Sequence, residues 1–151
     1  MAITIDEVLE VTLEVVVAFE RLLPQLSEAA PPLSTPDILE IVSSPGTTVM
    51  VARDSNQGIV GTVTLVSFRI PSGRRARIES LIVDRHARGL GVGRALCEAA
   101  LERATRAGAE SVDLTSSQSR KAANTLYQKM GFVLRTSNTY RLALPRTPYQ
   151  K

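Results

Sequence analysis

The chain has 151 residues, 44% of them hydrophobic and 22% charged, which excludes disordered and collagen-like proteins and favours one globular domain over residues 1–151. Its longest strongly apolar run, residues 15–19, is far shorter than the roughly 20 residues that a membrane-spanning helix needs. The net charge is +3, but residues 1–68 hold two basic and nine acidic side chains and residues 69–151 hold sixteen and six, so the second half suits an anionic partner.

The first third of the chain predicts two helices separated by a proline-rich loop. After a short strand at residues 3–5, apolar residues at three- and four-residue spacing predict a helix from residue 8 to 23, which Pro24 ends or kinks. Three prolines make residues 28–36 a loop. Thr35 is expected to cap a short helix over residues 37–42, with Pro36 at its first position.

The rest of the chain predicts three strands and then alternating helices and strands. Apolar, β-branched runs at residues 47–53 and 59–68 predict an antiparallel hairpin, and a third strand follows at 76–83. A helix over 91–107 then leads to a strand at 111–115, which must run parallel to the third strand. A helix over 120–130 and closing strands at 132–135 and 139–144 complete the pattern. The expected fold class is α/β (α+β), a mixed and mostly antiparallel sheet with one central parallel strand pair, flanked by helices.

The cysteine and histidine counts limit the chemistry and the compartment. The single cysteine, Cys97, cannot form an internal disulfide, and with only one histidine a zinc site is not expected. Cys97 lies within an amphipathic helical pattern and is expected to be buried rather than nucleophilic. The N-terminal residues are acidic where a secretory signal is basic. We therefore expect a cytoplasmic protein without a metal.

A glycine-rich turn between a predicted strand and a predicted helix is the most informative segment. Glycines alternate with other residues from Gly89 to Gly93, which lets the backbone approach a ligand and lets several N–H groups point one way. The N-terminus of the helix adds unpaired donors and partial positive charge. This arrangement predicts a phosphate site flanked by Arg85, Arg88 and Arg94, although a glycine-rich turn without a ligand is the alternative.

Two common phosphate motifs do not fit this turn. No Lys-Ser or Lys-Thr follows the glycines, so the turn is not the P-loop of ATP- and GTP-binding proteins. A dinucleotide fingerprint ends in glycine or alanine, but the two available frames end in Arg94 and Leu96. The second half also lacks the interleaved aromatic residues of single-strand binders, so nucleic acid is disfavoured as a partner.

Two motifs of the sequence resemble those of the GCN5-related N-acetyltransferases (GNAT) and follow each other in the same order as in that family. Residues 88–93, Arg-Gly-Leu-Gly-Val-Gly, match the signature Q/R-x-x-G-x-G/A, and the segment from Asn124 to Tyr127, followed by Gly131-Phe132, matches the family's second motif. The resemblance covers roughly residues 46–144. It implies a GNAT-like fold and acetyl-CoA as co-substrate, with the pyrophosphate held by Arg88, Gly89, Leu90, Gly91, Val92, Gly93 and Arg94. Many relatives carry a basic residue where Leu90 stands, which leaves the phosphates to the backbone and the arginines.

The family's reaction, acetyl transfer from a thioester to an amine, needs a base and an acid. An amine with a pKa near 10.4 must lose a proton before it attacks, and the departing thiolate leaves more easily when a group with a pKa near 10 protonates it. The resemblance makes Tyr127 this acid and places Asn124, three residues earlier on the same helix face, beside the pantetheine. A core tyrosine packed under the sheet is the alternative.

Glu79 is the candidate base. It lies in a predicted strand of apolar or small residues, where an unpaired carboxylate is costly, and strict alternation places it on the side of Leu81 and Val83. The resemblance makes it a base that acts directly or through water; a salt bridge to Arg77 or another arginine is the alternative. The backbone of Leu81, Ile82 and Val83 is implied to pair with the pantetheine, while the strand ending at residue 115 splays away.

These observations predict an acetyl-CoA-dependent N-acetyltransferase that acts on a primary amine by direct transfer in a ternary complex. A small-molecule amine is favoured as acceptor, no membrane partner is expected, and a homodimer through residues 132–144 is possible. Four arginines surround the turn near residue 72: Arg69, Arg74, Arg75 and Arg77. They form either a solvated hairpin tip or a recognition site for an acceptor that carries a carboxylate or phosphate. A non-catalytic acyl-CoA-binding module and a basic nucleic-acid-associated protein remain the alternatives.

Overall fold

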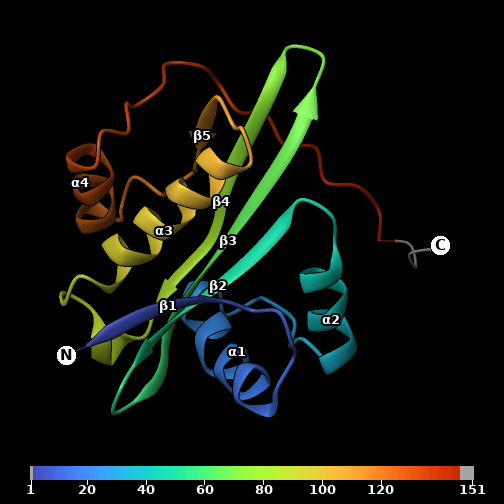
Figure 1. Cartoon of the computed structure of the whole chain (residues 1–151). Coiled ribbons are helices and arrows are strands. Elements are labelled where there is room, and N and C mark those ends of the chain that lie inside the picture. The colour runs from blue at the N-terminus through green and yellow to red at the C-terminus, as the bar shows by residue number, and fades with distance from the viewer. Residues whose placement is uncertain (1, 147–151) are drawn as a thin grey trace. The chain divides into compact units, whose positions relative to one another are not determined.

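The computed structural model describes residues 2–146 of the chain (Figure 1). The elements are, in chain order, β1 (Ile3–Glu7), α1 (Leu13–Leu26), α2 (Thr35–Ser43), β2 (Thr47–Asp54), β3 (Gly58–Ile70), β4 (Gly73–Val83), the 3₁₀ helix η1 (Arg85–Ala87), α3 (Val92–Arg106), β5 (Ser111–Asp113) and α4 (Lys121–Lys129). The described residues form two compact units, 2–115 and 116–146. One domain over the whole chain stays a prediction.

The first unit is built on a five-stranded sheet with the order β1-β2-β3-β4-β5. The first four strands are antiparallel to their neighbours, and β5 runs parallel to β4 over three residue pairs, from Arg75–Ser111 to Arg77–Asp113. The predicted class, a mixed and mostly antiparallel sheet with one parallel pair, is confirmed. The parallel pair lies at an edge of the described sheet and not at its centre.

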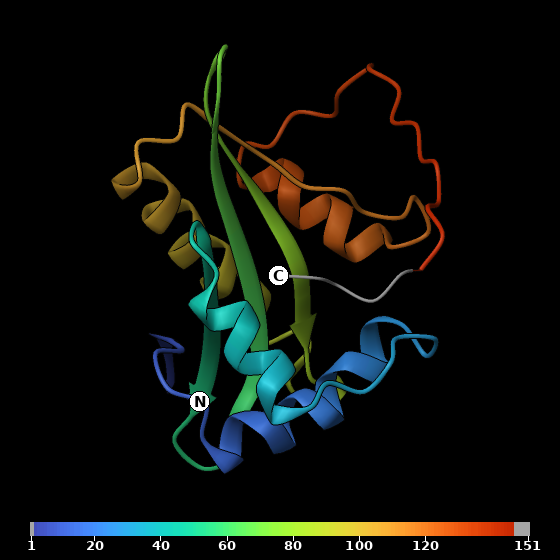
Figure 2. The ribbon, with the colours of Figure 1, turned by 90° about the vertical axis from the view of Figure 1, so that its right-hand side faces the viewer.

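Helices cover both faces of this sheet. Figure 2 shows α1 and α2 together on one face, where they bury a cluster that includes Val15, Ala18, Leu22, Ile38, Val49, Val51 and Ile82. On the other face α3 buries Val92, Leu96, Ala100 and Ala104. A Cβ on Gly61 of β3 would lie 3.0 Å from Leu96 Cδ1 and 3.0 Å from the Ile82 carbonyl oxygen. Glycine at this position therefore lets α3 pack closely on the sheet.

The first helix begins later and ends later than its periodicity predicts. The Val8 N–H donates to the Val49 carbonyl at 2.8 Å, which keeps this residue beside β2. The Thr12 side chain then accepts a hydrogen bond from the Val15 N–H and caps α1. Pro24 lies inside the last turn of α1 and does not end it. The periodicity located the apolar face correctly, but tertiary hydrogen bonding decided where the helix starts.

The cap of α2 is one residue earlier than predicted. Ser34 Oγ accepts from the Asp37 N–H at 3.2 Å, and Asp37 Oδ2 accepts from the Ser34 N–H at 2.8 Å. This reciprocal capping box satisfies two backbone donors, whereas Thr35 as cap would satisfy fewer. Thr35 is consequently the first residue of the helix.

The two closing strands are a wrong prediction for the described residues. Neither residues 132–135 nor residues 139–144 form a strand. Apart from Phe132, their large apolar side chains are 79–89% exposed, at Val133, Leu134, Tyr140, Leu142 and Leu144. A strand needs a neighbouring backbone as well as β-prone residues, and alternation in the sequence does not supply that neighbour. Because these segments do not extend the sheet, β5 is its edge.

Candidate active site

A β-bulge interrupts β4 at the predicted base. Thr64 pairs with Glu79 and Thr62 pairs with Ile82, so two residues, Ser80 and Leu81, stand opposite one residue of β3. Ser80 has a φ of +49°, a conformation uncommon outside glycine. Cross-strand partners share a face, so Glu79 lies on the face of Ile82, which is the α1–α2 face. The predicted placement of Glu79 with Val83 is wrong, because a bulge shifts the alternation by one residue.

After Arg77, one edge of β4 is no longer paired with another strand of the described chain. The pairing of β4 with β5 ends at Arg77–Asp113, and residues 78–83 have no strand partner on that side within the described chain. Arg77 connects β4 with the end of the segment that follows β5: its Nε donates to Glu79 Oε1 at 3.1 Å and its Nη2 donates to Thr115 Oγ1 at 3.2 Å. The salt-bridge alternative for Glu79 is therefore present, and the Glu79 side chain is still 50% exposed.

The glycine turn begins at an ion pair with α1. Asp84 directly follows β4, and its Oδ2 accepts from Arg21 Nε at 3.0 Å. The Arg21 Nη2 also donates to the Ile59 carbonyl at 2.6 Å, and Gln25 Oε1 accepts from the Arg85 N–H at 3.0 Å. Two side chains of α1 thus hold the start of the turn. No pattern in the sequence indicates this role of Arg21 and Gln25, because both contacts join residues about 60 positions apart.

Asp84 is a buried carboxylate with several donors. The residue is only 7% exposed. Burial alone would raise the pKa of Asp84, but hydrogen bonds from Arg21, the His86 N–H and Gln25 outweigh it and hold the pKa below its usual value. The carboxylate consequently stays charged at neutral pH and remains bound to Arg21.

The glycines leave the N-terminus of α3 open. Gly89 and Gly91 have φ values of +77° and +86°, which favour glycine, and a Cβ on either would meet no atom within 4 Å. Gly91 is the N-cap residue of α3. Because glycine has no side chain, it does not cap the N–H groups of the first helical turn. The first helical bond runs from the Ala95 N–H to the Gly91 carbonyl, so the N–H groups of residues 92–94 have no partner within the helix.

Two arginines border this open turn. Arg88 Nε donates to the Val83 carbonyl at 3.0 Å, which leaves its other guanidinium donors available. Arg94 Nε pairs with Glu98 Oε1 at 2.9 Å on the surface of α3. Leu90 is 59% exposed between them. Positive charge and backbone donors therefore occur together at the open turn, an arrangement that suits a phosphate group.

The remaining candidates lie in the second unit. Asn124 Nδ2 donates to the Ser117 and Arg120 carbonyls at 2.9 and 2.8 Å, so this side chain orders the turn before α4. Tyr127 is 7% exposed, and its ring packs edge-on against Phe132 with centroids 5.9 Å apart. The structure thus brings Glu79, the open β4 edge and the glycine turn together in one unit. That Asn124 and Tyr127 act at the same cofactor stays a prediction.

Cys97 does not have the properties of a nucleophile. Its side chain is fully buried in α3, and burial, helped by Glu98, raises the pKa of the thiol to about 11. A thiolate is the reactive form of cysteine, and little of it exists at neutral pH. Within residues 2–146, no three His, Cys, Asp or Glu side chains are grouped to hold a metal ion. No helix in this range is long and apolar enough to cross a bilayer.

Comparison with known proteins agrees with this arrangement. The sequence model of the Acetyltransferase (GNAT) family matches residues 16–132. No curated protein matches the chain. A search of solved structures found an acetyltransferase from Trypanosoma brucei, 28% identical, with a TM-score of 0.75, covering 95% of this chain and 100% of that one.

Two further similar structures have different acceptors in their names. A glucosamine-6-phosphate N-acetyltransferase from Arabidopsis thaliana is 19% identical, with a TM-score of 0.75 and coverage of 94% of this chain and 99% of that one. A ribosomal-protein-alanine N-acetyltransferase from Brucella melitensis biovar Abortus 2308 is 18% identical, with a TM-score of 0.74 and coverage of 95% and 100%. At these identities the likeness establishes the shared fold.

Replacing Asp84 with asparagine is expected to lower the free energy of unfolding at pH 7 by about 1–2 kcal/mol, because charge-assisted hydrogen bonds to α1 are lost. The pKa of Asp84 is lower in the folded state, so the carboxylate stabilises the fold above the unfolded pKa of about 3.9, and this stability is lost as the pH falls through the folded pKa. Urea unfolding from pH 7 to pH 3 should therefore show the two proteins converging. Glu98→Gln, which removes an exposed ion pair, serves as control; a difference that does not change with pH contradicts the prediction.

Proposed function

The chain belongs to the GNAT family of acetyltransferases, and from this membership we propose that it transfers the acetyl group of acetyl-CoA to a primary amine, directly and within a ternary complex. The observation that carries the proposal is the uncapped N-terminus of α3, with open space above Gly89 and Gly91, next to a β4 edge that no described strand covers. A diphosphate and an extended thioester arm need these two features side by side.

The turn fits the diphosphate of coenzyme A. The N–H groups of Val92, Gly93 and Arg94 would donate to its oxygens, with the backbone of residues 89–91 around it and the Arg88 guanidinium beside it. Methyl groups on Gly89 and Gly91 would fill the space that the phosphates need. The partial positive charge of the α3 N-terminus favours a bound anion without a metal ion.

The backbone of Leu81, Ile82 and Val83 would hold the pantetheine arm as a further strand. These residues lie on the β4 edge that β5 leaves uncovered, and unpaired backbone groups at an edge bind extended chains. The Asp84 N–H donates to the Val60 carbonyl, so Ile82, two residues earlier and paired with Thr62, also directs its backbone groups to β3. The backbone groups at the open edge are therefore those of Leu81 and Val83, and one lone pair of the Val83 carbonyl already accepts from Arg88. Bound acetyl-CoA supplies the thioester whose carbonyl carbon the amine attacks.

Two side chains would move the protons. Glu79, half-exposed on the α1–α2 face, accepts a proton from the incoming ammonium, directly or through a water molecule. Arg77 holds one oxygen of this carboxylate and leaves the other able to accept. Tyr127 donates its phenolic proton to the sulfur of the departing thiolate, and Asn124 binds the pantetheine nearby. Direct transfer is favoured over an acyl-enzyme on Cys97, because this buried thiol stays protonated.

We favour a small-molecule amine as the acceptor. We further propose that the enzyme is cytoplasmic and can form a homodimer. The fold is shared with an amino-sugar acetyltransferase and with a ribosomal-protein-alanine acetyltransferase, so the fold alone does not choose between small and macromolecular amines. A panel of amino sugars, arylamines and peptides, assayed by release of free thiol, tests the choice. Tight coenzyme A binding without turnover on any amine would favour a non-catalytic binding module.

Gly91→Ala is expected to weaken coenzyme A binding at least tenfold, because its methyl group enters the space above the turn. Isothermal titration calorimetry measures the effect. Gly58→Ala is the matched control: Gly58, the first residue of β3, has a similar φ of +76°, so alanine there causes similar backbone strain away from the glycine turn. Absence of binding heat in the wild type, or equal weakening in both variants, would disprove the proposed cofactor site.

Tyr127→Phe is expected to lower kcat by about 10²–10⁴, the usual contribution of a general acid, while the Kd for coenzyme A changes less than about twofold. The ring packing on Phe132 is retained in this variant, and its thermal unfolding curve verifies that it folds. Thiol release can be followed with a thiol reagent, since the buried Cys97 does not react. Tyr140→Phe, at a side chain that is 89% exposed, is the control and should keep full activity; equal kcat in both variants would exclude Tyr127 as the acid.

Glu79→Gln separates a catalytic base from a structural ion pair. As a base, its loss lowers kcat/KM by about 10²–10⁴. As an ion-pair partner only, its loss changes the free energy of unfolding by less than about 1 kcal/mol and leaves kcat/KM unchanged. Steady-state kinetics and urea unfolding at pH 7, with Glu98→Gln as control, distinguish the two outcomes.

A further inference from the structure

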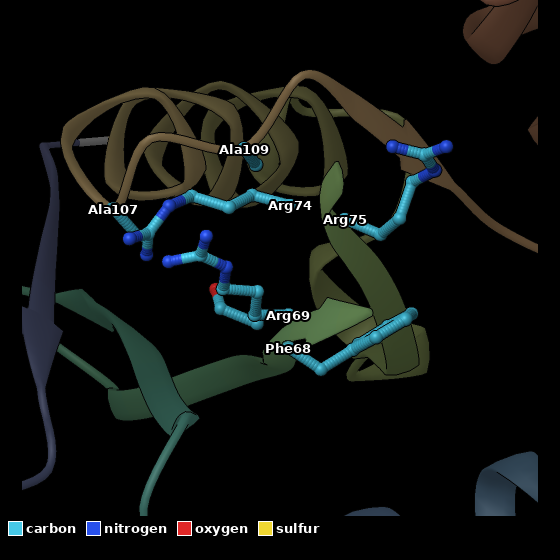
Figure 3. Close-up of a pocket in the computed structure, with 7 residues that line it drawn as sticks. Phe68, Arg69, Arg74, Arg75, Ala107 and Ala109 are labelled. Atoms are coloured by element: carbon cyan, nitrogen blue, oxygen red, sulfur yellow. The ribbon is translucent and has the colours of Figure 1, made fainter. Parts of the chain in front are cut away.

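The tip of the β3–β4 hairpin carries a second concentration of positive charge. A hollow of about 130 Å³ lies there, lined by Ser67, Phe68, Arg69, Arg74, Arg75, Ala107 and Ala109. Arg69 and Arg74 are cross-strand partners, so they share a face of the hairpin. Figure 3 shows their guanidinium groups turned toward each other, whereas Arg75 points away.

The charges of Arg69 and Arg74 are not balanced by carboxylates. Within residues 2–146, the ion pairs involve other arginines: 21, 53, 75, 77 and 94. Arg75, the third arginine of the hollow, pairs with Glu110 at 3.2 Å. Like charges directly opposite each other on two strands destabilise a sheet. An anion between the two guanidinium groups would reverse this cost.

The turn between α3 and β5 holds Arg74 in place. The Arg74 carbonyl accepts from the Glu110 N–H at 2.9 Å. A Cβ on Gly108, whose φ is +81°, would lie 3.4 Å from Arg74 Cδ and 3.9 Å from its Nε, so the stem of the arginine passes over this glycine. The small side chains of Ala107 and Ala109 leave space beside it. Arg74 is therefore directed into the hollow by its surroundings.

Capping of α3 does not explain the two arginines. The carbonyls of Arg103, Ala104 and Thr105 already accept from the N–H groups of residues 107, 109 and 108, which closes the end of the helix with backbone bonds. No hydrogen bond from Arg69 or Arg74 to these carbonyls is present within the described chain. The guanidinium donors remain available to a ligand.

The hollow is separate from the proposed active site. Arg74 and Val83 are nine residues apart on β4, which corresponds to about 30 Å along an extended strand. Arg74 also lies on the α3 face with the buried Ala76 and Ile78, whereas Glu79 lies on the α1–α2 face. A phosphate group bound at the glycine turn therefore does not reach this hollow.

We propose that the hollow between Arg69 and Arg74 is a second anion site, which binds a doubly charged phosphate-type group. Two unbalanced guanidinium groups match the charge of a phosphate dianion better than that of a single carboxylate, and their planar donor pairs suit its oxygens. The volume is below the 300–1,000 Å³ of pockets for drug-sized ligands, so only the phosphate group enters. The site is independent of the proposed function.

Titration of the full chain with inorganic phosphate, followed through backbone amide signals in NMR spectra, tests the site. With sodium chloride matching the ionic strength, saturable shifts are expected at residues 73–75 and 107–109. They should persist when coenzyme A saturates the glycine turn, and they do not require coenzyme A to bind. Phosphoserine in place of phosphate identifies the source: tighter binding indicates a phosphoryl group on a larger molecule, and weaker binding indicates free phosphate.

The double variant Arg69→Gln, Arg74→Gln should bind phosphate at least tenfold more weakly. Arg106→Gln, which removes a charge from the last residue of α3 without touching the hollow, is the matched control and should bind like the wild type. The Tm of the double variant in chloride should not fall, because a repulsion is removed, which also verifies folding. No saturable shift in the wild type, equal weakening by Arg106→Gln, or equal affinity for acetate would overturn the proposal.

Discussion

Strand β4 pairs with β3 at both of its ends, but it pairs with β5 over only three residues, and the rest of the site depends on this constraint. Backbone donors and acceptors along an uncovered strand edge must find water or a ligand. Arg77 stands at the last shared pair and ties Glu79 to Thr115, so the opening has a defined start. The glycine turn and α3 then follow at the other end of the same edge.

The bulge in β4 combines two requirements that a regular strand cannot meet. Ile82 belongs to the apolar cluster under α1 and α2, and strict alternation would place Glu79 on the opposite face. The extra residue puts both side chains on one face, so the same strand anchors the core and presents a carboxylate to solvent. The left-handed backbone of Ser80 is the local cost of this arrangement.

Charge is arranged differently at the two ends of β4. At the glycine end, the acidic Asp84 is buried and balanced by Arg21, so backbone dipoles and Arg88 dominate the field at the open turn. At the hairpin end, Arg69 and Arg74 have no such balance among the described residues. The two ends of β4 therefore carry separate concentrations of positive charge, and a single anionic ligand at the glycine turn does not account for both.

The features that could be predicted from the residues alone are those that short-range chemistry controls. Helical and strand periodicity located the apolar faces, and the alternating glycines, which tolerate a positive φ, identified the turn and the open end of α3. The bulge at Ser80 and Leu81, the Arg21–Asp84 ion pair and the absence of strands after Gly131 within the described residues became visible only in the folded chain. Each of these depends on which distant backbone or side chain completes a hydrogen bond, and residue spacing along one chain does not contain that information.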